Sequence, residues 1–192
     1  MAIRKNGVRN FIEEFLTPFF PKPEWQSTVM KKTIHSIKEL ARFAQKIARS
    51  TKPGDVIGLV GELGAGKTTF VQCLAKALGV TARVNSPTFL VMRVYGAVSD
   101  KLSAIEQKNL RLKAYSLKLV HIDAYRLKSG QDLEAMGALE YIGAPDTITV
   151  IEWADRVKKI LPKKTRWIEF EHGKKPTERI IKYRHAELDS AS

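Results

Sequence analysis

The sequence predicts an α/β protein with a mostly parallel central sheet, flanking helices and antiparallel edge strands near the C-terminus. Apolar, strand-like runs alternate along the chain with helix-like runs, which is the order that builds a parallel sheet. One apolar run, 56–60, leads through a glycine-rich turn into helical periodicity, and segments 166–171 and 179–184 alternate as a hairpin does. The 192 residues suffice for one domain rather than two.

The first half of the domain follows from caps and periodicity. A helix is expected to begin after Ser36, because Glu39 stands at capping-box spacing and apolar residues follow at helical intervals. The run Val56–Val60 is apolar throughout, as in a strand buried on both faces. Helical spacing resumes over Thr68–Leu78 and ends at Gly79, a residue typical of helix C-termini.

The second half alternates in the same way. Apolar runs predict strands, and a short amphipathic run predicts one helix between them. The expected strands are 89–95, 117–122 and 147–151, and the expected helix is 132–139. The whole chain then divides into an N-terminal extension (1–32), a core domain (33–184) with an insertion at about 99–114, and a flexible tail (185–192). Aromatic residues between the prolines of the extension predict a short amphipathic helix.

The composition excludes several classes of protein. With 44% apolar and 28% charged residues the chain can bury a core, and 12 Gly, 8 Pro and 1 Cys exclude collagen-like and disulfide-stapled folds. No apolar run approaches the roughly 18 residues of a membrane-spanning helix, so no membrane partner is expected. The single cysteine, Cys73, cannot form an internal disulfide, which favours a reducing, cytoplasmic location.

The formal net charge is +13, from 33 Lys and Arg against 20 Asp and Glu. Segment 158–184 alone has ten basic and three acidic residues. Such a concentration is typical of a surface for nucleic acid or an acidic protein, and equally of a solvated lysine-rich hairpin. Charge alone leaves both interpretations open.

The segment Gly61–Thr68 reads GELGAGKT and matches the phosphate-binding pattern G-x-x-x-x-G-K-[ST] at every position. Its glycines let backbone N–H groups turn toward phosphate oxygens, Lys67 would reach the β- and γ-phosphates, and the Thr68 hydroxyl would bind Mg²⁺. The sequence therefore predicts a P-loop NTPase-like fold. The expected nucleotide-binding residues are Gly61, Glu62, Leu63, Gly64, Ala65, Gly66, Lys67, Thr68 and Thr69. Because the chain has no N/T-K-x-D guanine-binding motif after a later strand, ATP/ADP is favoured over GTP.

Two acids follow predicted strands, Asp123 after 117–122 and Glu152 after 147–151. Ligands of open α/β sheets bind at the carboxyl ends of strands, so both acids are candidates for metal and water chemistry, although strand-end acids also cap turns. Ser86–Phe89 (SPTF) is either a γ-phosphate-sensing turn or a simple Ser86 cap. Arg126 is expected to pair with Asp123, and Arg156 with Glu152.

Four blocks, GELGAGKT, SPTF (86–89), HIDAYRL (121–127) and IEWADR (151–156), resemble the TsaE (YjeE) family over about residues 36–183. This resemblance implies a Mg²⁺-dependent ATPase of tRNA threonylcarbamoyladenosine biosynthesis that joins TsaB and TsaD and meets tRNA indirectly. It implies that Thr68 and Glu152 are the metal ligands. It also implies that Asp123 is a second essential acid that arranges water, and that Thr88 belongs to a switch-like loop. Asp123, Thr88 and Lys67 are thus the expected catalytic residues.

The extension and the insertion depart from the compact family pattern without interrupting a motif. Two other functions remain open. A P-loop kinase for a small acceptor would need an arginine-rich lid, whereas the insertion has a single arginine, Arg111. A basic tRNA-binding module with a structural nucleotide would instead use the positive charge directly.

Overall fold

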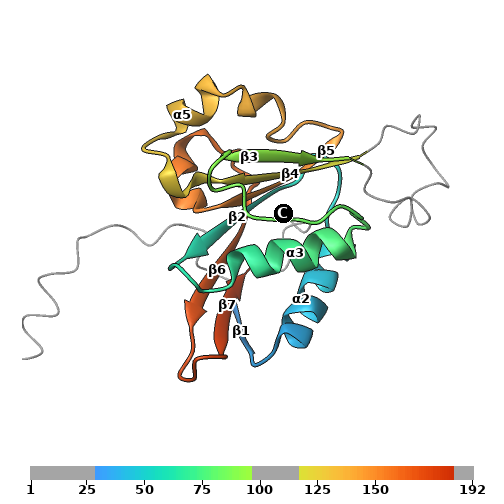
Figure 1. The fold of residues 1–192 in the computed structure, drawn as a ribbon, viewed down its shortest axis with the longest axis vertical. Coiled ribbons are helices and arrows are strands. Elements are labelled where there is room, and N and C mark those ends of the chain that lie inside the picture. Colours follow the sequence, from blue (N-terminus) through green and yellow to red (C-terminus); the bar gives the residue numbers. More distant parts are fainter. Residues whose placement is uncertain (1–28, 97–116, 184–192) are drawn as a thin grey trace, which may run out of the picture.

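The computed structural model describes residues 29–96 and 117–183, which form a seven-stranded sheet in the order β1-β7-β6-β2-β5-β4-β3 (Figure 1). The strands are β1 (Met30–Ile34), β2 (Val56–Gly61), β3 (Met92–Tyr95), β4 (Lys118–Asp123), β5 (Thr147–Glu152), β6 (Arg166–His172) and β7 (Arg179–Tyr183). Strand β2 lies at the centre, parallel to β5 and β6, and β4 is parallel to β5. The predicted α/β, mostly parallel class is confirmed.

Antiparallel strands complete both sides of the sheet. Strand β7 runs antiparallel to β6 and β1 antiparallel to β7, while β3 runs antiparallel to β4. The predicted C-terminal hairpin is therefore present, but its first strand is an interior strand parallel to β2. The edges are β1 and β3.

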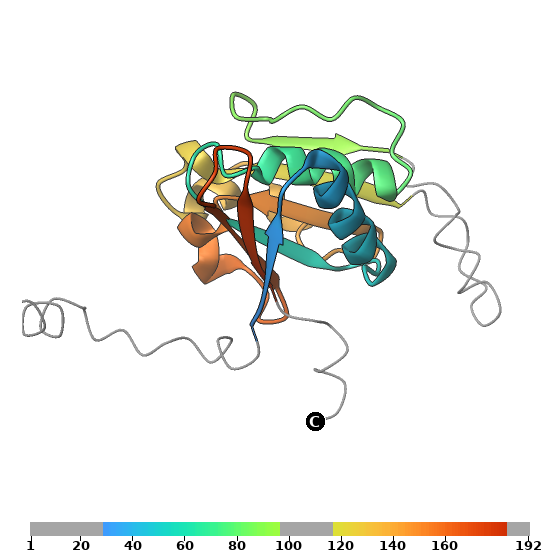
Figure 2. The same ribbon diagram turned by 90° about the horizontal axis from the view of Figure 1, so that it is seen from below.

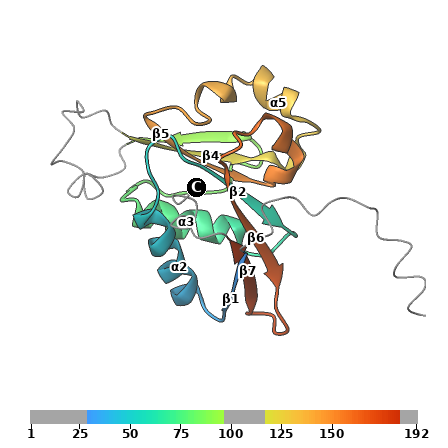
Figure 3. The same ribbon diagram turned by 180° about the vertical axis from the view of Figure 1, so that it is seen from behind.

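Helices cover the sheet on two faces (Figure 3). On one face, α2 (Ile37–Arg49) and α3 (Lys67–Ala77) pack on a core that includes Phe70 and Phe170. On the other face lie α5 (Gly130–Ala135) and the 3₁₀ segments η2 (Ala124–Arg126), η3 (Ala138–Glu140) and η4 (Ala154–Ile160). Each interior strand thus buries alternate residues against opposite helical layers.

The start of α2 agrees with its sequence signals. The Ser36 hydroxyl accepts the Glu39 N–H at 3.2 Å, and the Glu39 carboxylate accepts the His35 N–H at 2.9 Å. These bonds satisfy backbone donors that have no partner within the helix. Among the described residues, every helix is too short or too polar to cross a lipid bilayer.

Several predicted boundaries were wrong. The strand expected at 89–95 begins only at Met92, because the N–H groups of Leu90 and Val91 both donate to the Pro87 carbonyl and turn the chain first. The helix expected at 132–139 is divided into α5 and η3 by Gly137, whose φ of +70° is left-handed. A helix cannot continue through that conformation.

The boundary expected at residue 32 falls inside β1, which pairs with β7 along its whole length (Figure 2). The sheet therefore begins at Met30. The helix expected in the extension, the insertion at 99–114 and the tail at 185–192 lie outside the described residues.

Candidate functional site

The phosphate-binding motif forms a tight loop between β2 and α3. Gly61, Gly64 and Gly66 have φ values of +136°, +75° and +101°, a region that glycine enters without steric cost. At Gly61 there is also a steric requirement, because a Cβ atom would lie 2.1 Å from the Phe170 carbonyl oxygen. Helix α3 begins directly after the loop with no side-chain cap on its first N–H groups, which leaves these donors for an anion.

Lys67 is the first residue of α3, and its side chain folds back over the loop. Its Nζ donates to the carbonyl oxygens of Gly61 (2.6 Å) and Glu62 (2.8 Å) and lies 3.8 Å from the centroid of the Trp153 ring. Burial lowers the pKa of Lys67, and the nearby carboxylates of Glu152 and Asp123 act in the opposite direction. The ammonium is thus held inside a partly dehydrated, acidic site.

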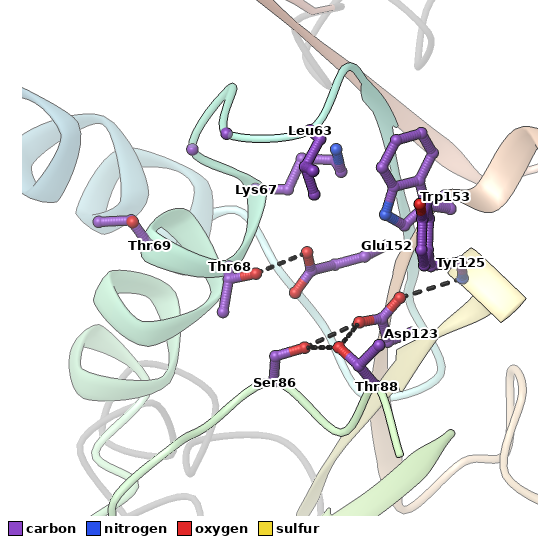
Figure 4. Close-up of a pocket in the computed structure, with 12 residues that line it drawn as sticks. Leu63, Lys67, Thr68, Thr69, Ser86, Thr88, Asp123, Tyr125, Glu152 and Trp153 are labelled. Atoms are coloured by element: carbon purple, nitrogen blue, oxygen red, sulfur yellow. Dashed lines mark hydrogen bonds between the residues drawn. The ribbon is translucent and has the colours of Figure 1, made fainter. Parts of the chain in front are cut away.

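Glu152 ends β5, the strand beside β2, and faces the start of α3. The Thr68 hydroxyl donates to Glu152 Oε2 at 2.8 Å, and only 2% of Glu152 is exposed (Figure 4). A hydroxyl and a carboxylate are hard oxygen donors of the kind that Mg²⁺ prefers. Within residues 29–96 and 117–183 no three His, Cys, Asp or Glu side chains form a metal cage. The Thr68–Glu152 pair supplies two such oxygen donors, and this donor set fits Mg²⁺ whose other ligands are phosphates and water.

Asp123 ends β4, one strand further along. Its Oδ2 accepts the hydroxyls of Ser86 (2.8 Å) and Thr88 (2.5 Å), and its Oδ1 accepts the Tyr125 N–H at 3.0 Å (Figure 4). The two hydroxyls also lie 2.6 Å apart. The SPTF turn is therefore bound to the second acid rather than capped by Ser86 alone.

These groups surround one cavity of about 380 Å³. The side chains and loop glycines that line it come from the P-loop, the SPTF turn and the ends of β4 and β5: Leu63, Gly64, Gly66, Lys67, Thr68, Thr69, Ser86, Thr88, Asp123, Tyr125, Glu152 and Trp153. Three of the expected binding residues, Gly61, Glu62 and Ala65, do not line it. The carbonyl oxygens of Gly61 and Glu62 instead accept hydrogen bonds from the Lys67 ammonium, and Ala65 is fully buried.

Three neighbours of the acids were not predicted as site residues: Tyr125, which lines the cavity, His121 and Trp153. His121 is fully buried with its Nε2 at 2.8 Å from Glu152 Oε1. Trp153 follows Glu152 in a left-handed conformation (φ +57°), which turns its ring over Lys67. Strand alternation could have found His121, because it stands two residues before Asp123 and thus on the same face. The orientation of Trp153 has no comparable local signal.

The expectation that Arg126 pairs with Asp123 and Arg156 with Glu152 is wrong. Neither arginine forms an ion pair with Asp123 or Glu152 in the structure. Arg126 Cζ lies 4.5 Å from the centroid of the Phe89 ring, and Arg156 Cζ lies 5.5 Å and 5.8 Å from those of Tyr125 and Trp153. Both carboxylates already have closer hydrogen-bond donors, so the guanidinium groups pack on aromatic faces.

A glycine loop between a parallel strand and a helix, with acids at the ends of the next two strands, defines a P-loop protein. Comparison with known proteins identifies the family within this class. The family described as "Threonylcarbamoyl adenosine biosynthesis protein TsaE" matches residues 34–181. The chain belongs to this family, and the resemblance seen in its sequence motifs is confirmed.

Individual relatives agree with this assignment. A tRNA threonylcarbamoyladenosine biosynthesis protein TsaE from Streptomyces coelicolor is 38% identical over 120 residues, which cover 62% of this chain and 68% of the relative. One from Treponema pallidum is 35% identical over 136 residues, covering 71% and 87%. The crystal structure of Bacillus subtilis YdiB matches with a TM-score of 0.59 and 28% identity, covering 81% of this chain and 84% of that one.

Proposed function

We propose that this protein is a Mg²⁺-dependent ATPase whose turnover supports a TsaB–TsaD complex in tRNA threonylcarbamoyladenosine formation. One observation carries the ATPase part: the P-loop lysine, the Thr68–Glu152 pair and Asp123 all line a single cavity. Membership of the TsaE family supports the pathway. The TsaB and TsaD partners, indirect contact with tRNA and a cytoplasmic location belong to the proposal.

Each residue has a role that follows from its chemistry and position. The loop N–H groups and the Lys67 ammonium bind the phosphates of ATP. Thr68 and Glu152 would hold Mg²⁺, which when bound neutralises charge on the phosphates. Asp123 lies across the same cavity, where a carboxylate orients the attacking water and accepts its proton.

The SPTF turn is suited to control this step. The Ser86 and Thr88 hydroxyls both occupy Asp123 Oδ2. For that oxygen to bind water, at least one hydroxyl must leave it. The position of Thr88 therefore determines whether Asp123 Oδ2 is free to bind water. A loop whose position controls a catalytic group in this way is switch-like.

The test is ATP turnover by the purified protein, alone and with candidate TsaB and TsaD partners. We expect partners to raise turnover, Lys67→Ala to abolish nucleotide binding, and Asp123→Ala to lower turnover by about 10²–10⁴-fold while nucleotide affinity changes much less. Normal turnover by the Asp123→Ala variant would disprove the role of that acid.

Turnover, together with a tRNA-binding measurement, distinguishes the ATPase from the kinase and from the tRNA-binding module. Phosphorylation of a small acceptor, with turnover indifferent to partners, would identify a kinase instead. Salt-sensitive tRNA binding by the isolated protein, without ATP hydrolysis in any mixture, would identify a basic tRNA-binding module.

A further inference from the structure

We propose that His121 is a positioning residue of the metal site, which holds the Glu152 carboxylate in the orientation that serves Thr68 and Mg²⁺. The proposal rests on the proposed function, because it concerns the same Thr68–Glu152 pair. His121 itself lies behind the carboxylate and does not line the cavity. It acts on a ligand, not on nucleotide or metal.

The sheet register brings the two side chains together. Strands β4 and β5 are parallel, with His121 opposite Val150 and Asp123 opposite Glu152. Since side chains alternate along a strand, His121, Asp123 and Glu152 share the face that packs against α3. Glu152 is therefore the diagonal neighbour of His121, within reach of a long side chain.

Glu152 is bound through both of its oxygens. Oε2 accepts the Thr68 hydroxyl and Oε1 meets His121 Nε2, each at 2.8 Å. A carboxylate held at one oxygen only can rotate about its last torsion, whereas bonds from opposite sides fix the plane. The pair is almost fully buried, with 0% of His121 and 2% of Glu152 exposed, so water does not readily replace either bond.

The surroundings of His121 also define its donor nitrogen. A carboxylate that binds Mg²⁺ only accepts hydrogen bonds, so in the proposed site Nε2–H donates to Glu152 Oε1. The other ring nitrogen, Nδ1, is buried without a hydrogen-bond partner in the described part of the chain. At a buried position without a partner, a bare Nδ1 lone pair costs less than an unpaired N–H. The structure thus favours the Nε2–H tautomer, the arrangement by which second-layer groups orient metal ligands.

Two substitutions of His121 test whether the position of its N–H donor, rather than the bulk of its ring, determines the affinity for Mg²⁺. Glutamine can place an amide N–H near the position of Nε2, whereas asparagine reaches only the region of Nδ1. We expect H121N to weaken the apparent affinity for Mg²⁺ by about 10–100-fold. We expect H121Q to recover most of it and both variants to bind nucleotide normally without Mg²⁺. The readout is a Mg²⁺ titration of ADP binding by calorimetry, which requires no turnover.

The matched control is T149V. Thr149 is a fully buried polar residue of β5 whose hydroxyl bonds the Tyr141 carbonyl at 2.9 Å, away from the cavity. We expect T149V to lower thermal stability without changing Mg²⁺ affinity. If H121N and T149V lose stability alike and Mg²⁺ affinity is unchanged in both, the His121 proposal is overturned.

Two further measurements keep the outcome decisive. In the unmodified protein, long-range ¹H–¹⁵N spectra should show His121 protonated at Nε2 and bare at Nδ1, and the reverse tautomer would overturn the proposal even if no variant folds. Glu152→Gln and Thr68→Ala should each reduce Mg²⁺ affinity. If they do not, the proposed metal site itself fails; if they do and H121N does not, only the role of His121 fails.

Discussion

Alanine substitution of two glycines in the same loop offers a direct test of the structure. Gly61 and Gly66 both have left-handed φ values, +136° and +101°, so Gly→Ala strains the backbone at either position by about 1–3 kcal/mol. Their surroundings differ. A Cβ at Gly61 would lie 2.1 Å from the Phe170 carbonyl oxygen, whereas a Cβ at Gly66 meets nothing within 4 Å.

The clash at Gly61 is with backbone and cannot be relieved by a rotamer change. Gly61 and Phe170 are register partners of β2 and β6, so the strands must separate by nearly 1 Å to reach the 3.0 Å at which real contacts begin. Overpacking of this kind costs about 1–3 kcal/mol. The free energy of unfolding of G61A should therefore be about 1–3 kcal/mol lower than that of G66A. This difference corresponds to a Tm lower by about 2–12 °C for a domain of this size.

The assay is urea denaturation followed by circular dichroism, with both variants and the parent protein measured in the absence of nucleotide. The difference between the variants is the informative quantity, because the loss of glycine flexibility is common to both. Equal unfolding free energies, within about 0.5 kcal/mol, would refute the close approach of β2 to β6 at this loop.

Two other predictions concern charge and burial. A double-mutant cycle with Lys67→Met and Trp153→Leu should give a coupling energy of about 0.5–2 kcal/mol in thermal unfolding, because the ammonium lies over the indole ring, and zero coupling would contradict that contact. Burial raises the pKa of the Cys73 thiol above its ordinary value, and Lys76 acts in the opposite direction. Alkylation at pH 8 should therefore be slower than for a free cysteine peptide, and its pH midpoint should lie above that of the peptide. The stabilisation from the neutral thiol is present below the unfolded pKa and is lost as the pH rises through the folded pKa; a midpoint at or below that of the peptide would contradict the burial.

The features predicted correctly from sequence have local causes. The P-loop pattern, the Ser36 cap and the placement of Asp123 and Glu152 at strand ends each depend on a few adjacent residues. Their signals are glycine conformations, cap spacing and the termination of apolar runs. Parallel strands place both acids at the same edge of the sheet as the loop, and the strand order, in which β5 and β4 follow β2, then brings them to one cavity.

The features that sequence could not supply depend on distant partners. Strand β1 carries Lys31 and Lys32 in a five-residue run and is ordered by its pairing with β7, about 150 residues later. The bonds from Ser86 and Thr88 to Asp123 cross 37 and 35 residues. The packing of Arg126 and Arg156 on aromatic rings follows from competition, because nearer donors already satisfy the acids.

The pairing of β1 with β7 has a practical consequence for engineering. Met30 and Tyr183 are opposite each other in the register, so the first and last strands of the described core end side by side (Figure 2). A short covalent linker between these positions would close the core into a ring. That ring could be reopened at a surface turn at the opposite end of the parallel strands from the cavity, such as the one at residues 162–165 before β6, to give a circular permutant with the same sheet. Reporter groups attached beside Met30 and Tyr183 would then report fraying of this edge independently of the proposed nucleotide site, which is built on β2, β4 and β5.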